Sequence, residues 1–156
     1  MCSSDLNSQL VTMDLATGAR SRVPLEQAAD GWIDPENGAV LFTRLPWQGS
    51  NTKRYMGGTA QQIWRWDGKG EAVALTKDYD GTSKRPMIYK GRVYFATDRD
   101  GTMNIWSMKE DGSDLKQHTT HAGGDVIGPN LSVASGTIVY QLGADIWKLD
   151  ITSGKN

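Results

Sequence analysis

The feature that most constrains this chain is an Ile-Trp pair that recurs at a nearly constant spacing. Ile63-Trp64, Ile105-Trp106 and Ile146-Trp147 lie 42 and 41 residues apart. The segments around them also align, as QQIWRWDGKGEAVALT, MNIWSMKEDGSDLKQHT and ADIWKLDITSGK. A period of roughly 40 residues is typical of proteins that repeat one supersecondary unit, so we expect a repeat architecture.

Each repeat contains four short segments with the character of β-strands. RPMIYKG (85–91) leads into RVYFATDRDG (92–101), the Ile-Trp segment follows, and an outer segment at 115–119 completes the unit. Apolar and polar residues alternate along these segments, as in strands. Asp-Gly pairs such as Asp111-Gly112 separate them, and the glycine supplies the positive φ of a tight hairpin. Four antiparallel strands repeated in this way predict a β-propeller blade.

The repeats predict an all-β chain that forms part of a propeller, with about three four-stranded antiparallel blades of about 41 residues each. We expect a disordered or artefactual leader at 1–8, followed by propeller structure at 9–156. The expected divisions are a blade end, two blades and an incomplete blade, at 9–25, 28–76, 84–119 and 127–156. Because propellers close with roughly four to eight blades, we expect an internal fragment whose open faces favour association.

The first six residues, MCSSDL, resemble a translated sequencing adapter, and an ordinary frayed terminus is the alternative.

Charge and composition exclude other classes of protein. The 156 residues contain 17 Lys+Arg and 18 Asp+Glu, a balance that argues against non-specific nucleic-acid binding and a polybasic membrane anchor. No apolar run of about 18 residues is present, so no membrane span is expected. The single cysteine, Cys2, excludes an internal disulfide.

One connection departs from the period. The connection before Ile63 is 11 residues longer than the one before Ile105, and it contains LPWQGSNTKRYMGG (45–58). Long loops in compact repeats often carry function, and a decorative or packing loop is the alternative. Arg54 can bind a carboxylate through two parallel N–H···O bonds, and Lys53 adds a point charge. The segment therefore predicts a site for a carboxylate, a phosphate or an acidic side chain.

Other patterns are weaker. His118 and His121 could share a metal, but surface or turn-stabilising histidines are the preferred interpretation because no third ligand is nearby. Segments 78–81 and 98–101 begin like calcium loops, yet neither has Glu at the twelfth position. The sequence therefore predicts no metal and no cofactor. No serine lies in a recognisable nucleophile context, so no catalytic residue is expected here.

The tryptophans divide into two groups. Three occupy one repeat position and are expected to pack against a neighbouring blade: Trp64, Trp106 and Trp147. Trp47 lies inside the long connection instead. There it is expected to line a channel beside Lys53 and Arg54.

Three segments carry a resemblance to a known family: TKRYMGGTAQQIW, TDRDGTMNIWSMKEDGSDLKQHT and GTIVYQLGADIWKLDITSG. Over roughly residues 9–155 the chain resembles the N-terminal propeller of the tricorn protease family, large serine peptidases that trim short peptides. The Asp-Arg-Asp-Gly-x-x-Asn-Ile-Trp pattern is shared with TolB-type propellers. The loop at 52–55, followed by Gly57-Gly58-Thr59-Ala60-Gln61, is more specific to the tricorn family.

The resemblance implies a propeller that gates peptide substrates for catalytic domains located downstream in a homo-oligomeric parent protein. A basic pair in the family's propeller anchors the substrate's C-terminal carboxylate. The match places this role on Lys53 and Arg54, with Tyr55 and Trp47 as further substrate-binding residues. Lys53 stands where the family pattern has Arg, which weakens a two-pronged grip at that position.

Two alternatives remain open. The first is a non-enzymatic TolB-type propeller that binds protein partners. The second is the propeller of another serine peptidase, such as the prolyl oligopeptidase group. The resemblance implies a cytoplasmic protein, and a periplasmic location stays open because the natural N-terminus is expected to be missing.

Overall fold

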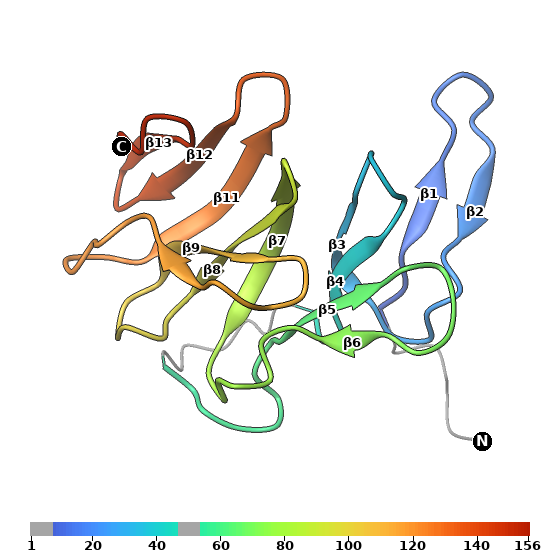
Figure 1. The fold of residues 1–156 in the computed structure, drawn as a ribbon, viewed down its shortest axis with the longest axis horizontal. Helices are drawn as coiled ribbons and strands as arrows, with labels where there is room; N and C mark the ends of the chain where they lie inside the picture. Colours follow the sequence, from blue (N-terminus) through green and yellow to red (C-terminus); the bar gives the residue numbers. More distant parts are fainter. Residues whose placement is uncertain (1–7, 47–53) are drawn as a thin grey trace.

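The computed structural model describes residues 8–46 and 54–156, and every regular element in them is a β-strand. The strands form four antiparallel sheets that follow one another along the chain (Figure 1). Two of these sheets have four strands each, so the predicted all-β fold of four-stranded antiparallel units is confirmed. The described part contains no helix that is long and apolar enough to cross a membrane.

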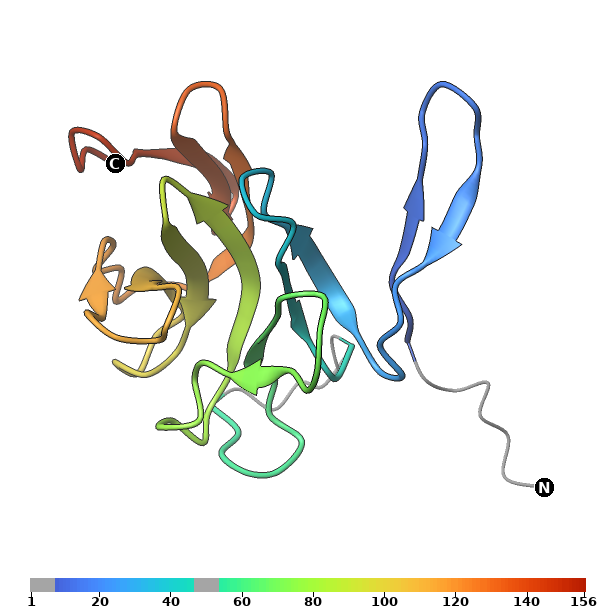
Figure 2. The same ribbon diagram turned by 45° about the vertical axis from the view of Figure 1, so that its right-hand side comes forward.

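The first sheet is a hairpin of β1 (Val11–Met13) and β2 (Arg20–Arg22). The second contains β3 (Ala29–Ile33), β4 (Val40–Thr43), β5 (Ile63–Trp66) and β6 (Val73–Ala74). The third contains β7 (Ser83–Tyr89), β8 (Arg92–Thr97), β9 (Asn104–Lys109) and β10 (Lys116–Gln117). The fourth contains β11 (Val126–Ser132), β12 (Thr137–Leu142) and β13 (Asp145–Asp150). The β1–β2 hairpin and the β11–β13 sheet lie at opposite ends of the row in both views (Figure 1, Figure 2).

The same cross-strand register recurs in the three larger sheets. The Trp of each Ile-Trp pair faces an aromatic residue on the preceding strand: Phe42 with Trp64, Phe95 with Trp106 and Tyr140 with Trp147. Because side chains alternate along a strand, the Ile and the Trp of each pair lie on opposite faces of their sheet. In the second and third sheets, one face is therefore directed at the preceding sheet and the other at the following sheet.

The apolar core lies between neighbouring sheets. Ile63 packs with Phe95 and Met108 of the following sheet, and Ile105 packs with Ile138 in the same way. These side chains are at most 1% exposed, and full burial of each stabilises the fold by about 1.5–3 kcal/mol. Every blade therefore depends on its neighbour for a large part of its stability.

The tryptophan prediction is confirmed at two of three positions. Trp64 and Trp106 are partly buried against apolar clusters that join two sheets. Trp147 remains 38% exposed, and its ring stands edge-on to His121 with centroids 5.3 Å apart. The third tryptophan is therefore less well covered than its repeat position predicts.

Each larger sheet also has an irregular first strand. The register shifts between Ala29 and Trp32 in β3, between Lys84 and Met87 in β7, and between Ile127 and Asn130 in β11. Each bulge contains one residue with positive φ, and these are Asp30 (47°), Arg85 (56°) and Gly128 (56°). A bulge redirects side chains from the normal alternation, and such bulges occur often beside functional sites.

Candidate functional site

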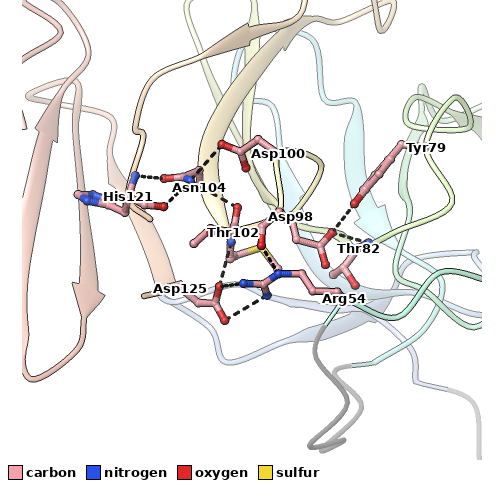
Figure 3. A network of polar contacts seen from close by, with 11 residues as sticks. Arg54, Tyr79, Thr82, Asp98, Asp100, Thr102, Asn104, His121 and Asp125 are labelled. Atoms are coloured by element: carbon pink, nitrogen blue, oxygen red, sulfur yellow. Dashed lines mark hydrogen bonds and ion pairs between the residues drawn. The ribbon is translucent and has the colours of Figure 1, made fainter. Parts of the chain in front are cut away.

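The long connection between β4 and β5 is described from Arg54 onward, so Trp47 and Lys53 lie outside the described residues. Arg54 has a φ of 60°, which is uncommon for a residue other than glycine. Its guanidinium nitrogens Nη2 and Nη1 lie 2.9 and 3.4 Å from the two carboxylate oxygens of Asp125 (Figure 3). Its Nε donates a hydrogen bond to the carbonyl of Gly101. The long connection is thereby attached to two later sheets.

Asp125 orients this contact from the segment just before β11. One of its carboxylate oxygens also accepts a hydrogen bond from the Met103 backbone N–H at 3.0 Å. The Arg54 and Asp125 side chains are 37% and 20% exposed, so solvent partly screens their attraction. The predicted capacity of Arg54 to grip a carboxylate is thus used inside the protein, on a residue 71 positions away in the sequence.

Tyr55, the next predicted site residue, is 40% exposed and folds over Gly57. A Cβ added at Gly57 would lie 2.7 Å from the Tyr55 hydroxyl oxygen, and the Gly57 φ of 150° also disfavours other residues. Gly57 N–H donates to the Asp80 carbonyl at 3.0 Å. Gly58, in contrast, has open space where a Cβ would be, so only the first glycine of the pair is required by close approach.

The turn between β8 and β9 is joined by hydrogen bonds to the segment that precedes β7. Asp98 is 3% exposed, and one of its oxygens accepts hydrogen bonds from the Tyr79 hydroxyl and the Thr82 backbone N–H, each at 3.0 Å. Burial, then the hydrogen bond to Asp98, raises the pKa of Tyr79 to about 12. Tyr79 therefore remains a hydrogen-bond donor at all physiological pH values.

Asn104 connects the same turn to the sheet that follows. It is 1% exposed. Its side-chain oxygen accepts bonds from the His121 backbone N–H at 2.9 Å and the Thr119 hydroxyl at 2.8 Å. Its nitrogen donates to the His121 carbonyl at 3.1 Å and to Asp100 at 3.3 Å (Figure 3). Both polar atoms of this buried amide are satisfied, so Asn104 fixes the segment that leads to Asp125.

Gln62 makes equivalent contacts one repeat earlier. The Thr76 hydroxyl donates to its side-chain oxygen at 2.7 Å, while its nitrogen donates to the carbonyls of Tyr79 at 2.7 Å and Gly81 at 3.0 Å. The hydrogen bonds of the Gln62 and Asn104 side chains were not predicted from the sequence, because the segments that they join were treated only as turns. The signal was present, since an amide residue precedes the Ile-Trp pair in both repeats.

The two histidines form separate contacts. His118 Nε2 lies 2.8 Å from the Ser107 hydroxyl, and His121 Nε2 lies 2.9 Å from the Tyr140 hydroxyl. Ser107 is fully buried and also accepts a hydrogen bond from Arg92. A substrate therefore cannot reach the hydroxyl of this serine–histidine pair. The residues that the structure describes contain no group of three His, Cys, Asp or Glu side chains suited to a metal.

The consecutive antiparallel sheets, their shared register and their intersheet cores define the chain as a portion of a β-propeller. The sequence profile described as the Tricorn protease N-terminal beta propeller domain matches residues 2–155. The chain belongs to this family.

Known proteins agree with this assignment. The tricorn protease of Thermoplasma volcanium is 34% identical over 136 residues, a match that covers 80% of this chain and 13% of that protein. A crystal structure of the tricorn protease superposes with a TM-score of 0.73 at 24% identity, covering 88% of this chain and 14% of the other. A TolB structure from Agrobacterium tumefaciens gives 0.56 at 19% identity, covering 95% and 72%. The two structural likenesses show the fold.

Proposed function

We propose that this chain belongs to a tricorn-type serine peptidase, in which its propeller gates short peptides and anchors their C-terminal carboxylate at Arg54 and Lys53. The observation that carries the proposal is the two-pronged contact between Arg54 and the Asp125 carboxylate. A peptide's C-terminal carboxylate has the same charge and the same pair of acceptor oxygens. A guanidinium held in this position is therefore suited to receive it.

Exchange of carboxylates gives the anchor a simple mechanism. The incoming peptide displaces Asp125 from Arg54, so one ion pair is replaced by another and the net free energy is the difference between them. Lys53 is next to Arg54 in the sequence, and its positive charge adds to the attraction of the peptide's carboxylate. After release, one Asp125 oxygen still accepts the hydrogen bond from the Met103 backbone N–H, and the side chain is exposed enough for water to bind it as well.

The anchor would have a consequence for the reaction of the whole peptidase. A site that holds the free carboxylate at a fixed distance from a nucleophile makes the enzyme remove a fixed number of residues from the end. We assign the nucleophile and its base to domains outside residues 1–156. The Ser107–His118 pair supports this assignment, because Ser107 is fully buried and a substrate cannot reach its hydroxyl.

The test uses the 156-residue chain and a peptide in two forms, one with a free C-terminus and one amidated. We expect the free acid to bind more tightly, and Arg54→Ala to weaken its binding about tenfold while leaving the amide unchanged, because a partly desolvated charge pair is lost. Isothermal titration calorimetry measures both affinities. Arg20→Ala, an exposed position on β2, is the matched control.

Equal losses for the acid and the amide would count against the anchor. In the full-length parent peptidase, Lys53→Ala combined with Arg54→Ala should raise KM for free-acid peptides and spare amidated ones. A TolB-type propeller that only binds folded partners would show no preference for the free acid, so the same titration separates these two functions.

A further inference from the structure

A cavity of about 540 Å³ lies where the irregular first strands of three sheets approach one another. Its lining comes from β3, from β7, from the β8–β9 connection and from the segment around the start of β11, with one residue of the β12–β13 turn. The polar and apolar side chains used below are Asp30, Lys84, Arg85, Met103, Asp125 and Ile127. A volume of this size falls in the range of roughly 300–1,000 Å³ that is common for small-ligand sites.

The bulge in β7 explains why two cations line this cavity. In a regular strand, Lys84 and Arg85 would point to opposite faces of the sheet. The register shift between Lys84 and Met87, with a φ of 56° at Arg85, breaks that alternation. Both neighbours therefore line the same cavity.

The charges around the cavity are unevenly paired. Arg85 lies 3.3 Å from a carboxylate oxygen of Asp30, and Asp125 is held by Arg54 at 2.9 Å. Each lining carboxylate thus has an arginine. No ion pair within 4.0 Å among the described residues includes Lys84. Burial, then the charge of Arg85, lowers the pKa of Lys84, so its ammonium gains more from an additional carboxylate than an exposed lysine would.

The rest of the wall is apolar or lacks side chains. Met103 and Val126 are 7% and 1% exposed, whereas Ile127 remains 53% exposed beside the cavity. Glycines at 124, 128 and 143 contribute only backbone. A ligand that fills this space would place an apolar group against Met103 and Ile127 and a negative group against Lys84.

We propose that this cavity is a second carboxylate site, centred on Lys84, for a peptide residue that combines a carboxylate with an adjoining apolar group. The carboxylate comes either from the peptide's C-terminus or from an Asp or Glu side chain next to an apolar residue. The identification of the ligand as a peptide rests on the proposed function. The site is centred on Lys84 instead of Arg54, and the two sites share Asp125, which lines the cavity and pairs with Arg54.

The experiment follows backbone amide shifts of the 156-residue chain by NMR during titration with three peptides. They are acetyl-Ala-Ala-Leu as the free acid, its amide, and acetyl-Ala-Glu-Leu-amide. We expect a carboxylate-dependent shift at Gly124 and Gly128, which line the cavity, and a separate one at Gly101, whose carbonyl contacts Arg54. The first and third peptides distinguish a terminal carboxylate from a side-chain carboxylate.

Lys84→Met keeps the apolar stem and removes the charge. We expect it to weaken the carboxylate-dependent binding seen at Gly124 and Gly128 by about tenfold or more. Arg54→Ala affects this cavity only through the shared Asp125, so it should weaken the same binding by less. Lys77→Met, at an exposed position, is the control. Since an unpaired, half-buried charge is removed, the thermal midpoint of Lys84→Met should equal or exceed that of the unmodified chain.

If Arg54→Ala abolishes every carboxylate-dependent shift and Lys84→Met abolishes none of them, the second site is overturned and the anchor stands. Shifts at Gly124 and Gly128 that are equal for the acid, the amide and the glutamate peptide would also overturn it. Loss confined to Lys84→Met would support the second site and contradict the Arg54 anchor.

Discussion

Ile105 and Ile146 occupy the same place in two successive repeats, yet one is fully buried and the other is 78% exposed. Their cross-strand partners are equivalent too, Ala96 for Ile105 and Gln141 for Ile146. Ile105 packs against Ile138 of the next sheet, whereas no sheet of the described residues covers the corresponding face of β11–β13. The repeat motif therefore specifies which side chains form a face, and only a neighbouring blade buries that face.

The residues around the two isoleucines repeat the contrast. Val139 on β12 is 46% exposed, while Tyr94 and Leu41, at the equivalent places on β8 and β4, are 4% and 1% exposed. Ile127 on β11 is 53% exposed as well. We call Ile127, Val139 and Ile146 the open face. It shows what an interblade surface looks like when no other sheet of the described chain lies on it.

The largest expected effect comes from truncating the two isoleucines. Ile105→Ala should lower the free energy of unfolding by about 2–5 kcal/mol, because it leaves a cavity between two sheets. Ile146→Ala should change it by less than about 0.5 kcal/mol, because its side chain is exposed. Urea unfolding followed by tryptophan fluorescence measures both. Equal losses would show that the open face is covered in solution.

A second comparison uses the residues that precede these isoleucines. Asn104 is buried and satisfies both polar atoms, whereas Asp145 at the equivalent position is exposed. Asn104→Ala should destabilise the protein by about 1–3 kcal/mol, since His121 N–H and the Thr119 hydroxyl lose their acceptor. Asp145→Ala should be nearly neutral in the same assay. A neutral Asn104→Ala would mean that water replaces the amide.

The covered part of the molecule should also lose stability in mild acid. Burial, then the charges of Arg92 and Lys116, lowers the pKa of His118 below its usual 6.5. The unfolded chain therefore binds the proton more tightly, and this contribution to stability is complete above pH 6.5 and declines as the pH falls toward the folded-state pKa. Thermal unfolding at a series of pH values measures the decline. His118→Gln should reduce this decline in stability. An unchanged pH profile in the variant would show that His118 does not cause the decline.

The smallest expected effect concerns association through the open face. Exposed apolar patches favour contacts between molecules, so the chain should associate weakly at high concentration. Ile146→Lys should reduce that association without lowering the thermal midpoint, and sedimentation velocity detects the change. Lys148→Ile, on an exposed neighbouring position of β13, is the reverse variant and should increase association. If neither variant alters the sedimentation profile, the open face does not mediate self-association.

Much of the fold follows from the sequence because its signals are local. The Ile-Trp period, the Asp-Gly turns and the alternation of apolar residues predict antiparallel sheets and an all-β propeller. Positive φ at Gly101 and Gly112 agrees with the predicted hairpins. The division into a leader and blades at the predicted residue bounds stays a prediction, as does the substrate-binding role of Lys53, Arg54, Tyr55 and Trp47.

The remaining features depend on residues that are far apart in the sequence. Arg54 could be selected from its neighbours as a carboxylate-binding residue, but Asp125 follows 71 positions later and carries no local sign of the pairing. The cavity around Lys84 forms because bulges in separate strands meet, and bulges are set by packing. The sequence by itself determined the strands, their faces and the basic loop. Only the tertiary structure decided which isoleucine is buried, which carboxylate Arg54 holds and where Lys84 lies, because burial and charge pairing arise from neighbours that the chain brings together by folding.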